Sequence, residues 1–329
     1  MLNSPTNPMC PAASVDELLD RMSRTGFQGR KLGESYHIYK EMIETPGITI
    51  LLGLSGAMIP AGMQECLISL VEHRYVDAIV STGANIFHDI CEHLGVKHYQ
   101  GTHLVNDAEL YSRGIDRIYD VFAVEKEFQN IERYIGNFGT SLGDVRLSSR
   151  AFLKLLGEKI ASDRPEGRSV TSVCAKHNVP IHVPALADSG IGIGLVTACR
   201  CGAKLVIDQI ADASELAAFV ETSEKTGVIY LGGGTPKNFI QQTEVIPPMK
   251  GDKYIGGHSY AIQYTTDAPH WGGLSGCTFE EAVSWGKELP DAKKLQCFCD
   301  ATIALPLIVS ALITANAVRY RLVEEKYRN

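Results

Sequence analysis

The sequence predicts an α/β fold in which a parallel sheet is covered by helices on both faces. Apolar, β-rich runs repeatedly end in a Gly, Ser, Thr or Asp turn, and helical periodicity follows most of these turns. In addition, 45% of the 329 residues are hydrophobic, which is enough for a large buried core. Because parallel strands end at a common edge of the sheet, ligand-binding residues are expected in the loops that follow them.

The chain is expected to begin with a flexible polar arm, residues 1–20, that lacks the basic and apolar regions of a secretory signal. Helical periodicity runs through residues 14–44, and residues 47–74 give an apolar strand, a small-residue turn and a helix. No Pro- or Ser-rich linker divides the rest of the chain. One elaborated α/β domain over residues 21–329 is therefore predicted.

The strand, turn and helix pattern recurs along the rest of the chain. The β-rich runs begin the segments 76–95, 179–202, 203–210, 226–242, 258–269 and 294–313. The section 119–168 between them is more polar and helical. Residues 301–318 are uncharged, but Pro306 interrupts them and Ala, Thr, Ser and Asn are frequent, so a buried core helix is expected rather than a membrane span.

Charge and cysteine content exclude several classes of protein. The formal charge of −7 is dispersed and no basic stripe occurs, which argues against nucleic-acid binding. The nine cysteines include no C-x-x-C motif, so neither a disulfide framework nor a zinc site is indicated, and a cytoplasmic location fits best. Four histidines recur every five residues, from His88 to His103, a spacing that rotates successive helical side chains by about 140° and does not favour a metal site.

Two glycine-rich turns are candidate binding loops. Asp188 precedes Gly190, Gly192 and Gly194, and Asp208 follows at the end of the next apolar run, an arrangement similar to a dinucleotide-binding fingerprint. Tight packing between a strand and a helix explains the same glycines equally well. The run LGGGTPK, residues 231–237, is either a phosphate cradle or a plain turn, and it is not a P-loop.

The segment 278–289, TFEEAVSWGKEL, places a lysine beside one of the two tryptophans of the chain. Thr278 and Glu281 form a capping box, which predicts a helix over these residues. Lys287 near the end of this helix has two interpretations. It faces water and complements the helix dipole, or it lies in a poorly hydrated aromatic pocket, where a lowered pKa leaves a neutral amine able to attack an imine or a carbonyl.

Five motifs, STGAN, PALAD, LGGGTPK, EEAVSWGK and CDATIALPL, occur in an order that resembles the deoxyhypusine synthase family from about residue 45 onward. The resemblance implies a Rossmann-like parallel sheet and a homotetramer with sites at subunit interfaces. It also implies an NAD-dependent aminobutyl transferase. In that family, NAD takes a hydride from spermidine, a lysine holds the aminobutylidene group as an imine, and the group passes to an acceptor amine.

The resemblance assigns roles to individual residues. Lys287 would be the imine-forming lysine, and Trp285 and Glu281 would shape the polyamine site and pair with the polyamine. The other expected substrate-binding residues are Asn238, Gln242, Ile193 and Leu274. The expected NAD contacts are Thr82, Gly83, Ala84, His88, Asp188, Gly233, Gly234, Thr266, Asp267, Ser275, Gly276, Asp300 and Ala301.

Departures from the family pattern bear on the substrate. Ile193 and Leu274 stand where protein-modifying members carry polyamine-binding aspartates, Asn238 replaces a histidine, and His88 replaces an acid near the cofactor ribose. Because charge pairs in a dry site carry large energies, a small acceptor is expected, with putrescine giving homospermidine. The alternatives are a true deoxyhypusine synthase acting on a lysine of translation factor 5A and a non-catalytic NAD or polyamine sensor.

Overall fold

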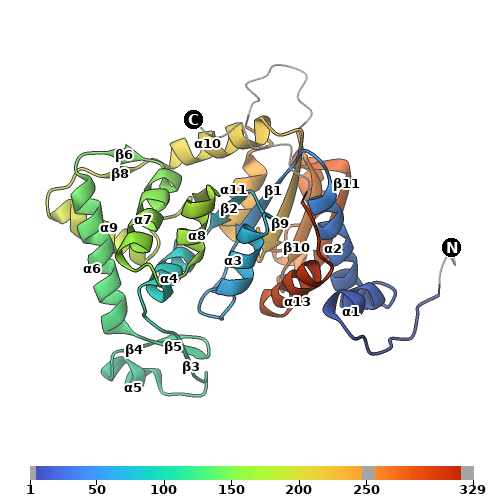
Figure 1. Ribbon diagram of the computed structural model, residues 1–329, viewed down its shortest axis with the longest axis horizontal. Coiled ribbons are helices and arrows are strands. Elements are labelled where there is room, and N and C mark those ends of the chain that lie inside the picture. The colour runs from blue at the N-terminus through green and yellow to red at the C-terminus, as the bar shows by residue number, and fades with distance from the viewer. Residues whose placement is uncertain (1–4, 247–255, 320–329) are drawn as a thin grey trace. The chain divides into compact units, whose positions relative to one another are not determined.

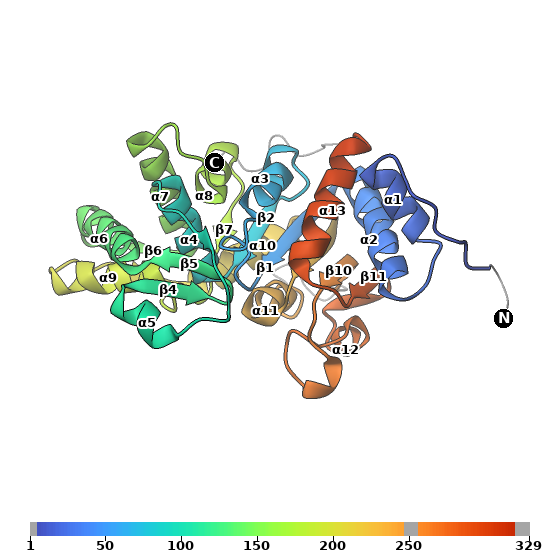
Figure 2. The same cartoon turned by 90° about the horizontal axis from the view of Figure 1, so that it is seen from below.

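A computed structural model describes residues 5–246 and 256–319 of the chain. Its main sheet has six strands in the order β11-β10-β9-β1-β2-β7. Figure 1 labels these strands except β7, which is labelled in Figure 2. The strands are β1 (Ile48–Leu54), β2 (Ala78–Ser81), β7 (Ile181–His182), β9 (Lys225–Leu231), β10 (His258–Tyr264) and β11 (Glu288–Cys297). β1, β9, β10 and β11 pair in parallel. The predicted α/β class with a parallel sheet is therefore confirmed.

The chain divides into two compact units. Unit 1 comprises residues 1–54, 73–79 and 215–329, and unit 2 comprises residues 55–72 and 80–214. The predicted division into an arm, residues 1–20, and one domain, residues 21–329, stays a prediction. Within the segment assigned to the arm, helix α1 (Val15–Met22) already begins at Val15.

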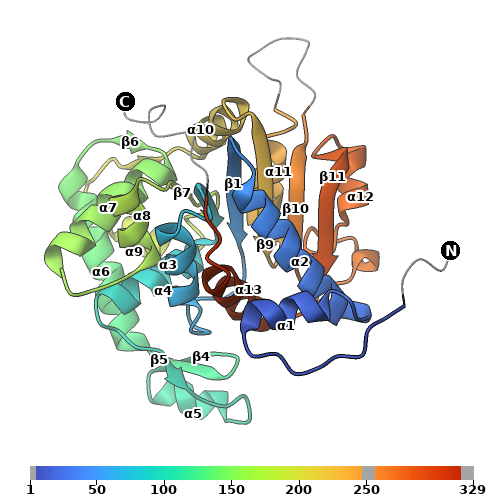
Figure 3. The same cartoon turned by 45° about the vertical axis from the view of Figure 1, so that its right-hand side comes forward.

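Unit 1 places helices on both faces of its strands. Helices α2 (Phe27–Glu44) and α13 (Ala301–Thr314) lie on one face, and α11 (Gly234–Gln242) and α12 (Phe279–Ser284) lie on the other, as Figures 2 and 3 show. Strand β9 follows the predicted pattern of an apolar run, and every residue after Lys225 in this strand is buried. Helix α13 buries Leu305 and Ile308 despite Pro306 in its interior. Among the described residues, no helix is long and apolar enough to cross a membrane.

Unit 2 is mainly helical. Its helices are α3 (Gln64–Glu72), α4 (Gly83–His93), α5 (Asp107–Ser112), α6 (Glu125–Leu142), α7 (Ser149–Asp163), α8 (Val170–His177) and α9 (Gly190–Arg200). β3 (Tyr99–Gln100), β5 (Val121–Val124) and β4 (Ile115–Ile118) form one small sheet, and β6 (Arg146–Leu147) and β8 (Val206–Ile207) form another. Helix α10 (Gln209–Glu221) begins in unit 2 and ends in unit 1.

The glycines after Asp188 serve packing. Strand β8, which a dinucleotide fold would place in the main sheet, pairs with β6. A Cβ atom on Gly192 would lie 2.3 Å from the Ala187 carbonyl oxygen, and one on Gly194 would lie 2.5 Å from that of Glu132 in α6. The carboxylate of Asp208 accepts from the N–H groups of Ile210 and Ala211 and so caps α10. Close packing of the chain therefore explains the glycines at 192 and 194.

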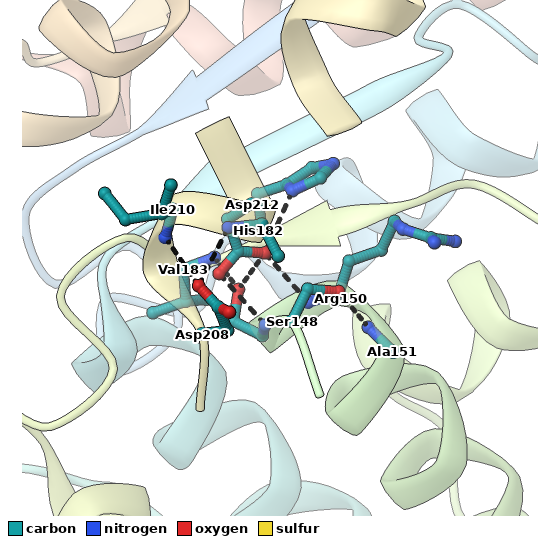
Figure 4. A network of polar contacts seen from close by, with 10 residues as sticks. Ser148, Arg150, Ala151, His182, Val183, Asp208, Ile210 and Asp212 are labelled. Carbon is teal, nitrogen blue, oxygen red and sulfur yellow. Dashed lines mark hydrogen bonds and ion pairs between the residues drawn. The ribbon is translucent and has the colours of Figure 1, made fainter. Parts of the chain in front are cut away.

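A buried carboxylate fixes the start of α7 (Figure 4). Asp212 is fully buried, and its oxygens accept from the Ser149 N–H and hydroxyl, each at 2.9 Å, and from the Arg150 N–H at 3.2 Å. His182 Nδ1 lies 3.2 Å from the same carboxylate. The Ser149 hydroxyl in turn accepts from the Val183 N–H, which links α7 to β7. Asp212 thus satisfies the first two backbone donors of α7, and the hydroxyl of the N-cap residue Ser148 accepts from the next, the Ala151 N–H, at 3.2 Å.

Replacing Asp212 with alanine is expected to lower the free energy of unfolding by roughly 2–4 kcal/mol, because buried donors lose a charged acceptor. Asp208→Ala is the matched control, since it removes a more accessible helix cap and should cost only about 1 kcal/mol. Denaturant unfolding of both variants measures the difference. Equal losses would contradict the role given to Asp212.

Candidate functional site

Lys287 lies in a tight turn after α12. The predicted cap at Thr278 is confirmed, because the Thr278 hydroxyl accepts from the Glu281 N–H at 3.1 Å. The predicted helix over 278–289 is wrong in its second half, because α12 ends at Ser284 and β11 begins at Glu288. Gly286, with φ of +70°, reverses the chain between them, a conformation that favours glycine. Lys287 is therefore presented by a turn rather than by a helix face.

The Lys287 amine has two neighbours in unit 1. Its Nζ donates to Asn238 Oδ1 at 3.0 Å and lies 5.4 Å from the ring centroid of Trp285. Lys287 is half-buried, whereas Trp285 is 62% exposed and Glu281 is exposed. The chain thus brings Lys287, Asn238 and Trp285 together, as the resemblance implied. The described residues of unit 1 leave the indole open to solvent.

A second lysine, Lys237, occupies the dry environment that was considered for Lys287. It is 1% exposed, and its Nζ donates to Gln263 Oε1 at 2.8 Å and to the Cys277 carbonyl at 2.6 Å. The rings of Tyr230 and Phe279 lie 5.9 Å and 5.3 Å from the same nitrogen. Burial lowers the pKa of Lys237 to about 8.

Glu288 is buried directly after Lys287. Its Oε1 accepts from Gln241 Nε2 at 3.2 Å, and its Oε2 has no hydrogen-bond partner among the described residues. Burial raises the pKa of Glu288 to about 7, although His258 opposes the shift. His258 Nδ1 lies 3.0 Å from Glu244 Oε1. Burial acts to lower the pKa of His258, but the neighbouring carboxylate of Glu244 outweighs it, and the pKa of His258 is raised. A half-buried lysine in the turn is therefore followed directly by a buried acid at the first position of β11.

Helix α11 holds both ends of the segment that carries the lysine. Lys237 binds the Cys277 carbonyl, just before the cap of α12. Asn238 and Gln241, three positions apart and so on one side of the helix, bind the side chains of Lys287 and Glu288 respectively. The position of the Lys287 amine is therefore set from α11.

Glu288→Gln is expected to remove a pH dependence of stability. The folded-state pKa of about 7 exceeds the ordinary value of 4.5, so the folded protein binds a proton that the unfolded chain lacks between these values. Wild-type stability should therefore fall relative to the variant by roughly 3 kcal/mol as pH rises from about 4.5 to about 7. Denaturant unfolding across this range, with exposed Glu280→Gln as control, measures the difference. A constant difference would contradict the assignment.

Unit 1 gathers most of the expected NAD contacts at the carboxyl ends of β9, β10 and β11. Gly233 packs so closely that a Cβ atom there would lie 2.4 Å from Ser275 Cα, and the Gly234 N–H donates to Ser275 Oγ at 3.1 Å. Asp300 caps α13 through Thr302. The other expected contacts follow the same strand ends or lie in the loop before α12: Thr266, Asp267, Gly276 and Ala301.

Unit 2 holds the remaining expected NAD contacts. Thr82 is the N-cap residue of α4, and Gly83 and Ala84 form its first turn. A Cβ atom on Gly83 would lie 2.6 Å from Ser189 Oγ, so this turn lies beside the exposed Asp188.

His88 belongs to a partly buried chain of polar groups in unit 2. Its Nδ1 lies 3.0 Å from His98 Nε2, and His98 Nδ1 lies 2.8 Å from Glu92 Oε1. Burial and the neighbouring His98 lower the pKa of His88 to about 4. The five-residue spacing excluded a shared helix face, yet these two histidines meet because the chain folds back after α4.

The remaining substrate-binding candidates are exposed. Leu274 of unit 1 is 46% exposed and Ile193 of unit 2 is 56% exposed. Gln242 is exposed at the end of α11. Sequence reasoning missed Lys237 and Glu288 as parts of the site. The available signal was their position, since each directly adjoins an assigned residue, Asn238 or Lys287.

Known proteins of similar sequence cover nearly the whole chain. Residues 17–312 match the sequence model of deoxyhypusine synthase. "Probable deoxyhypusine synthase 2" of Methanosarcina acetivorans is 55% identical over 311 residues, which are 94% of this chain and 90% of that protein. "Probable deoxyhypusine synthase 1" of the same organism is 40% identical over 309 residues, 94% of each chain.

The fold also has a counterpart among solved structures. A crystal structure from Entamoeba histolytica, described as a deoxyhypusine synthase, superposes with a TM-score of 0.63 at 20% identity, over 93% of this chain and 94% of that one. At this identity the likeness shows the fold. Together with the match over residues 17–312, it places the chain in the deoxyhypusine synthase family.

Proposed function

We propose that the chain is an NAD-dependent 4-aminobutyl transferase in which Lys287 carries the aminobutylidene group as an imine. The observation that carries the proposal is the Lys287 amine, held 3.0 Å from Asn238 Oδ1 and 5.4 Å from the Trp285 ring on an open face of unit 1. A nucleophilic amine needs a fixed position and access to its substrate. The turn at Gly286 and the contact from α11 provide both.

The other side chains have supporting roles. The Trp285 ring can bind the ammonium end of a polyamine by cation–π attraction. Glu281, exposed on the first turn of α12, supplies a carboxylate for a second ammonium group. Asn238 Oδ1 accepts a hydrogen bond from Lys287 and so directs the amine while the imine forms. Diaminopropane leaves when Lys287 replaces it on the four-carbon group.

Each unit, taken by itself, carries polar groups of kinds that bind parts of NAD. Asp267 and Asp300 offer carboxylates for ribose hydroxyls, and both follow parallel strands, where nucleotides bind in such sheets. No side chain caps α4 at Thr82, so its first N–H groups suit a pyrophosphate. When bound, NAD would accept a hydride from the donor amine and return it, so that the overall reaction involves no net oxidation.

The acceptor is proposed to be a small amine, with putrescine and spermidine giving homospermidine and 1,3-diaminopropane. Leu274 and Ile193 present apolar side chains where protein-modifying members carry aspartates. The chain is also closer to one of the two M. acetivorans relatives, at 55% against 40% identity, so one member of such a pair is free to take another acceptor. The names of both relatives favour the second candidate, modification of a lysine of translation factor 5A.

The test is incubation of the purified protein with NAD, spermidine and putrescine, followed by mass analysis of the polyamines. Homospermidine and diaminopropane in equal amounts are expected. Diaminopropane formed only when a 5A acceptor protein is added would overturn the small-acceptor proposal in favour of the second candidate. NAD binding without release of any diaminopropane would support a sensor. Light scattering tests the proposed homotetramer, and fractionation tests the proposed cytoplasmic location.

Leu274→Asp is expected to alter amine selection. A carboxylate at this exposed position adds a partner for an ammonium group, and one such pairing in a partly desolvated site contributes about 1–2 kcal/mol. The KM for spermidine should therefore fall about tenfold while the maximal rate changes little. Leu274→Asn is the control for size. An equal fall in KM in both variants would contradict the charge argument.

A further inference from the structure

Two thiols lie side by side at the carboxyl end of β11, apart from the contacts of Lys287. Cys297 Sγ and Cys299 Sγ are 3.5 Å apart. Residues two apart on a strand face the same side, but their Cα atoms are about 7 Å apart. Here the Cys299 N–H donates to the Cys297 carbonyl at 3.1 Å, and this three-residue turn brings the two sulfurs into contact.

The surrounding structure holds this turn in place. Gln28 Oε1 accepts from the Phe298 N–H at 2.7 Å, and the Gln28 carbonyl lies 3.7 Å from Cys297 Sγ. On the other side, the Thr265 N–H donates to the Cys297 carbonyl at 3.1 Å. The thiols are thus kept together by bonds from two neighbouring segments of unit 1.

The two thiols differ in environment. Cys297 is buried, whereas Cys299 is partly exposed. The S–H group of Cys297 donates to Cys299 Sγ, which lowers the pKa of Cys299. A reactive thiol that is accessible and next to a second thiol is the arrangement of cysteines that form a disulfide through a sulfenic acid.

We propose that Cys297 and Cys299 form a dithiol site that hydroperoxides oxidise to an intrachain disulfide. The Cys299 thiolate attacks the terminal oxygen of the hydroperoxide, the O–O bond breaks, Cys299 becomes a sulfenic acid, and the remaining oxygen leaves as hydroxide or alkoxide and takes a proton. The Cys297 sulfur then attacks the Cys299 sulfur, the S–O bond breaks, and the hydroxyl leaves with the Cys297 proton as water. The two thiols have lost two electrons in total, and the hydroperoxide has accepted them. The sulfurs approach from 3.5 Å to about 2 Å, in the turn directly before Asp300, the cap of α13.

The chain contains its own comparison for this chemistry. Cys10, Cys199 and Cys201 are all exposed. Cys199 and Cys201 also have the same C-x-C spacing, at the end of helix α9. If exposure or spacing alone decided reactivity, these three thiols would react first. The geometry at the end of β11 predicts the opposite order.

The experiment treats the full chain with substoichiometric hydrogen peroxide, then unfolds it in N-ethylmaleimide and maps the cysteines by mass spectrometry. After oxidation, Cys297 and Cys299 are both expected to resist alkylation, and both should be alkylated again after reduction. The free thiols of this pair should disappear about tenfold faster than those of Cys199 and Cys201. Full alkylation of the β11 pair while the exposed thiols are oxidised would overturn the proposal. The readout does not use turnover, so it stands apart from the proposed function.

Two single variants separate the partners. In Cys297→Ser, oxidation should stop at a sulfenic acid on Cys299, which dimedone traps. In Cys299→Ser, peroxide should no longer modify this turn. The assignment of Cys299 as the reactive thiol would be overturned if dimedone labelled Cys297 in Cys299→Ser as fast as it labels Cys299 in Cys297→Ser. Circular dichroism confirms that each variant is folded.

Discussion

Replacing Lys287 with alanine is expected to lower aminobutyl transfer roughly 10³-fold or more, the scale found when a covalent nucleophile is removed, and to leave NAD binding unchanged. Lys237, on the same helix as Asn238, cannot act as a substitute amine, because it is buried and bound to Gln263 and to the Cys277 carbonyl. Product analysis gives the rate, and fluorescence titration gives the NAD affinity.

The control is Lys294→Ala, a partly exposed lysine on β11 whose amine donates to the Pro290 carbonyl. It should transfer at the wild-type rate. Borohydride reduction during turnover should add an aminobutyl group to the Lys287 peptide in the wild type and in this control. Retained turnover in Lys287→Ala, or an adduct on another lysine, would end the covalent assignment.

Local sequence patterns predicted the features of the site that are formed by residues close to one another in sequence. The cap at Thr278, the strand ends at β9 and β10 and the proximity of Trp285 to Lys287 all follow from spacing within a few residues. The end of α12 at Ser284 was missed because EEAVSWGK continues the helical pattern, and a single glycine with positive φ decides the matter.

Non-local contacts explain what spacing could not predict. Lys237 is buried because Gln263 and the Cys277 carbonyl, which are 26 and 40 positions away, accept from its amine. The pairing of β8 with β6 likewise joins segments about 60 residues apart, which the spacing of the glycines before β8 could not predict. A poorly hydrated pocket was one of the two interpretations of Lys287, and in the structure it is Lys237 that lies in such a pocket.

Lys237→Met is expected to change how stability depends on pH. The folded-state pKa of Lys237, about 8, lies below its ordinary value of 10.5, so between these values the unfolded chain binds a proton that the folded protein lacks. Wild-type stability should therefore rise relative to the variant by roughly 3 kcal/mol as pH increases from about 8 to about 10.5. Denaturant unfolding at several pH values gives this difference, with the partly exposed Lys294→Met as the control variant.

The Lys237→Met variant should fold, because both acceptors of the Lys237 amine keep another hydrogen-bond donor. Gln296 Nε2 also donates to Gln263 Oε1 at 2.7 Å and to the Cys277 carbonyl at 3.0 Å. Methionine fills a similar volume beside Tyr230 and Phe279 without a buried charge. If Lys237 also positions the start of the Lys287 segment, kcat should fall while NAD affinity stays the same. A pH-independent stability difference would show that Lys237 stays protonated in the folded protein, and its burial would then cost the same at every pH.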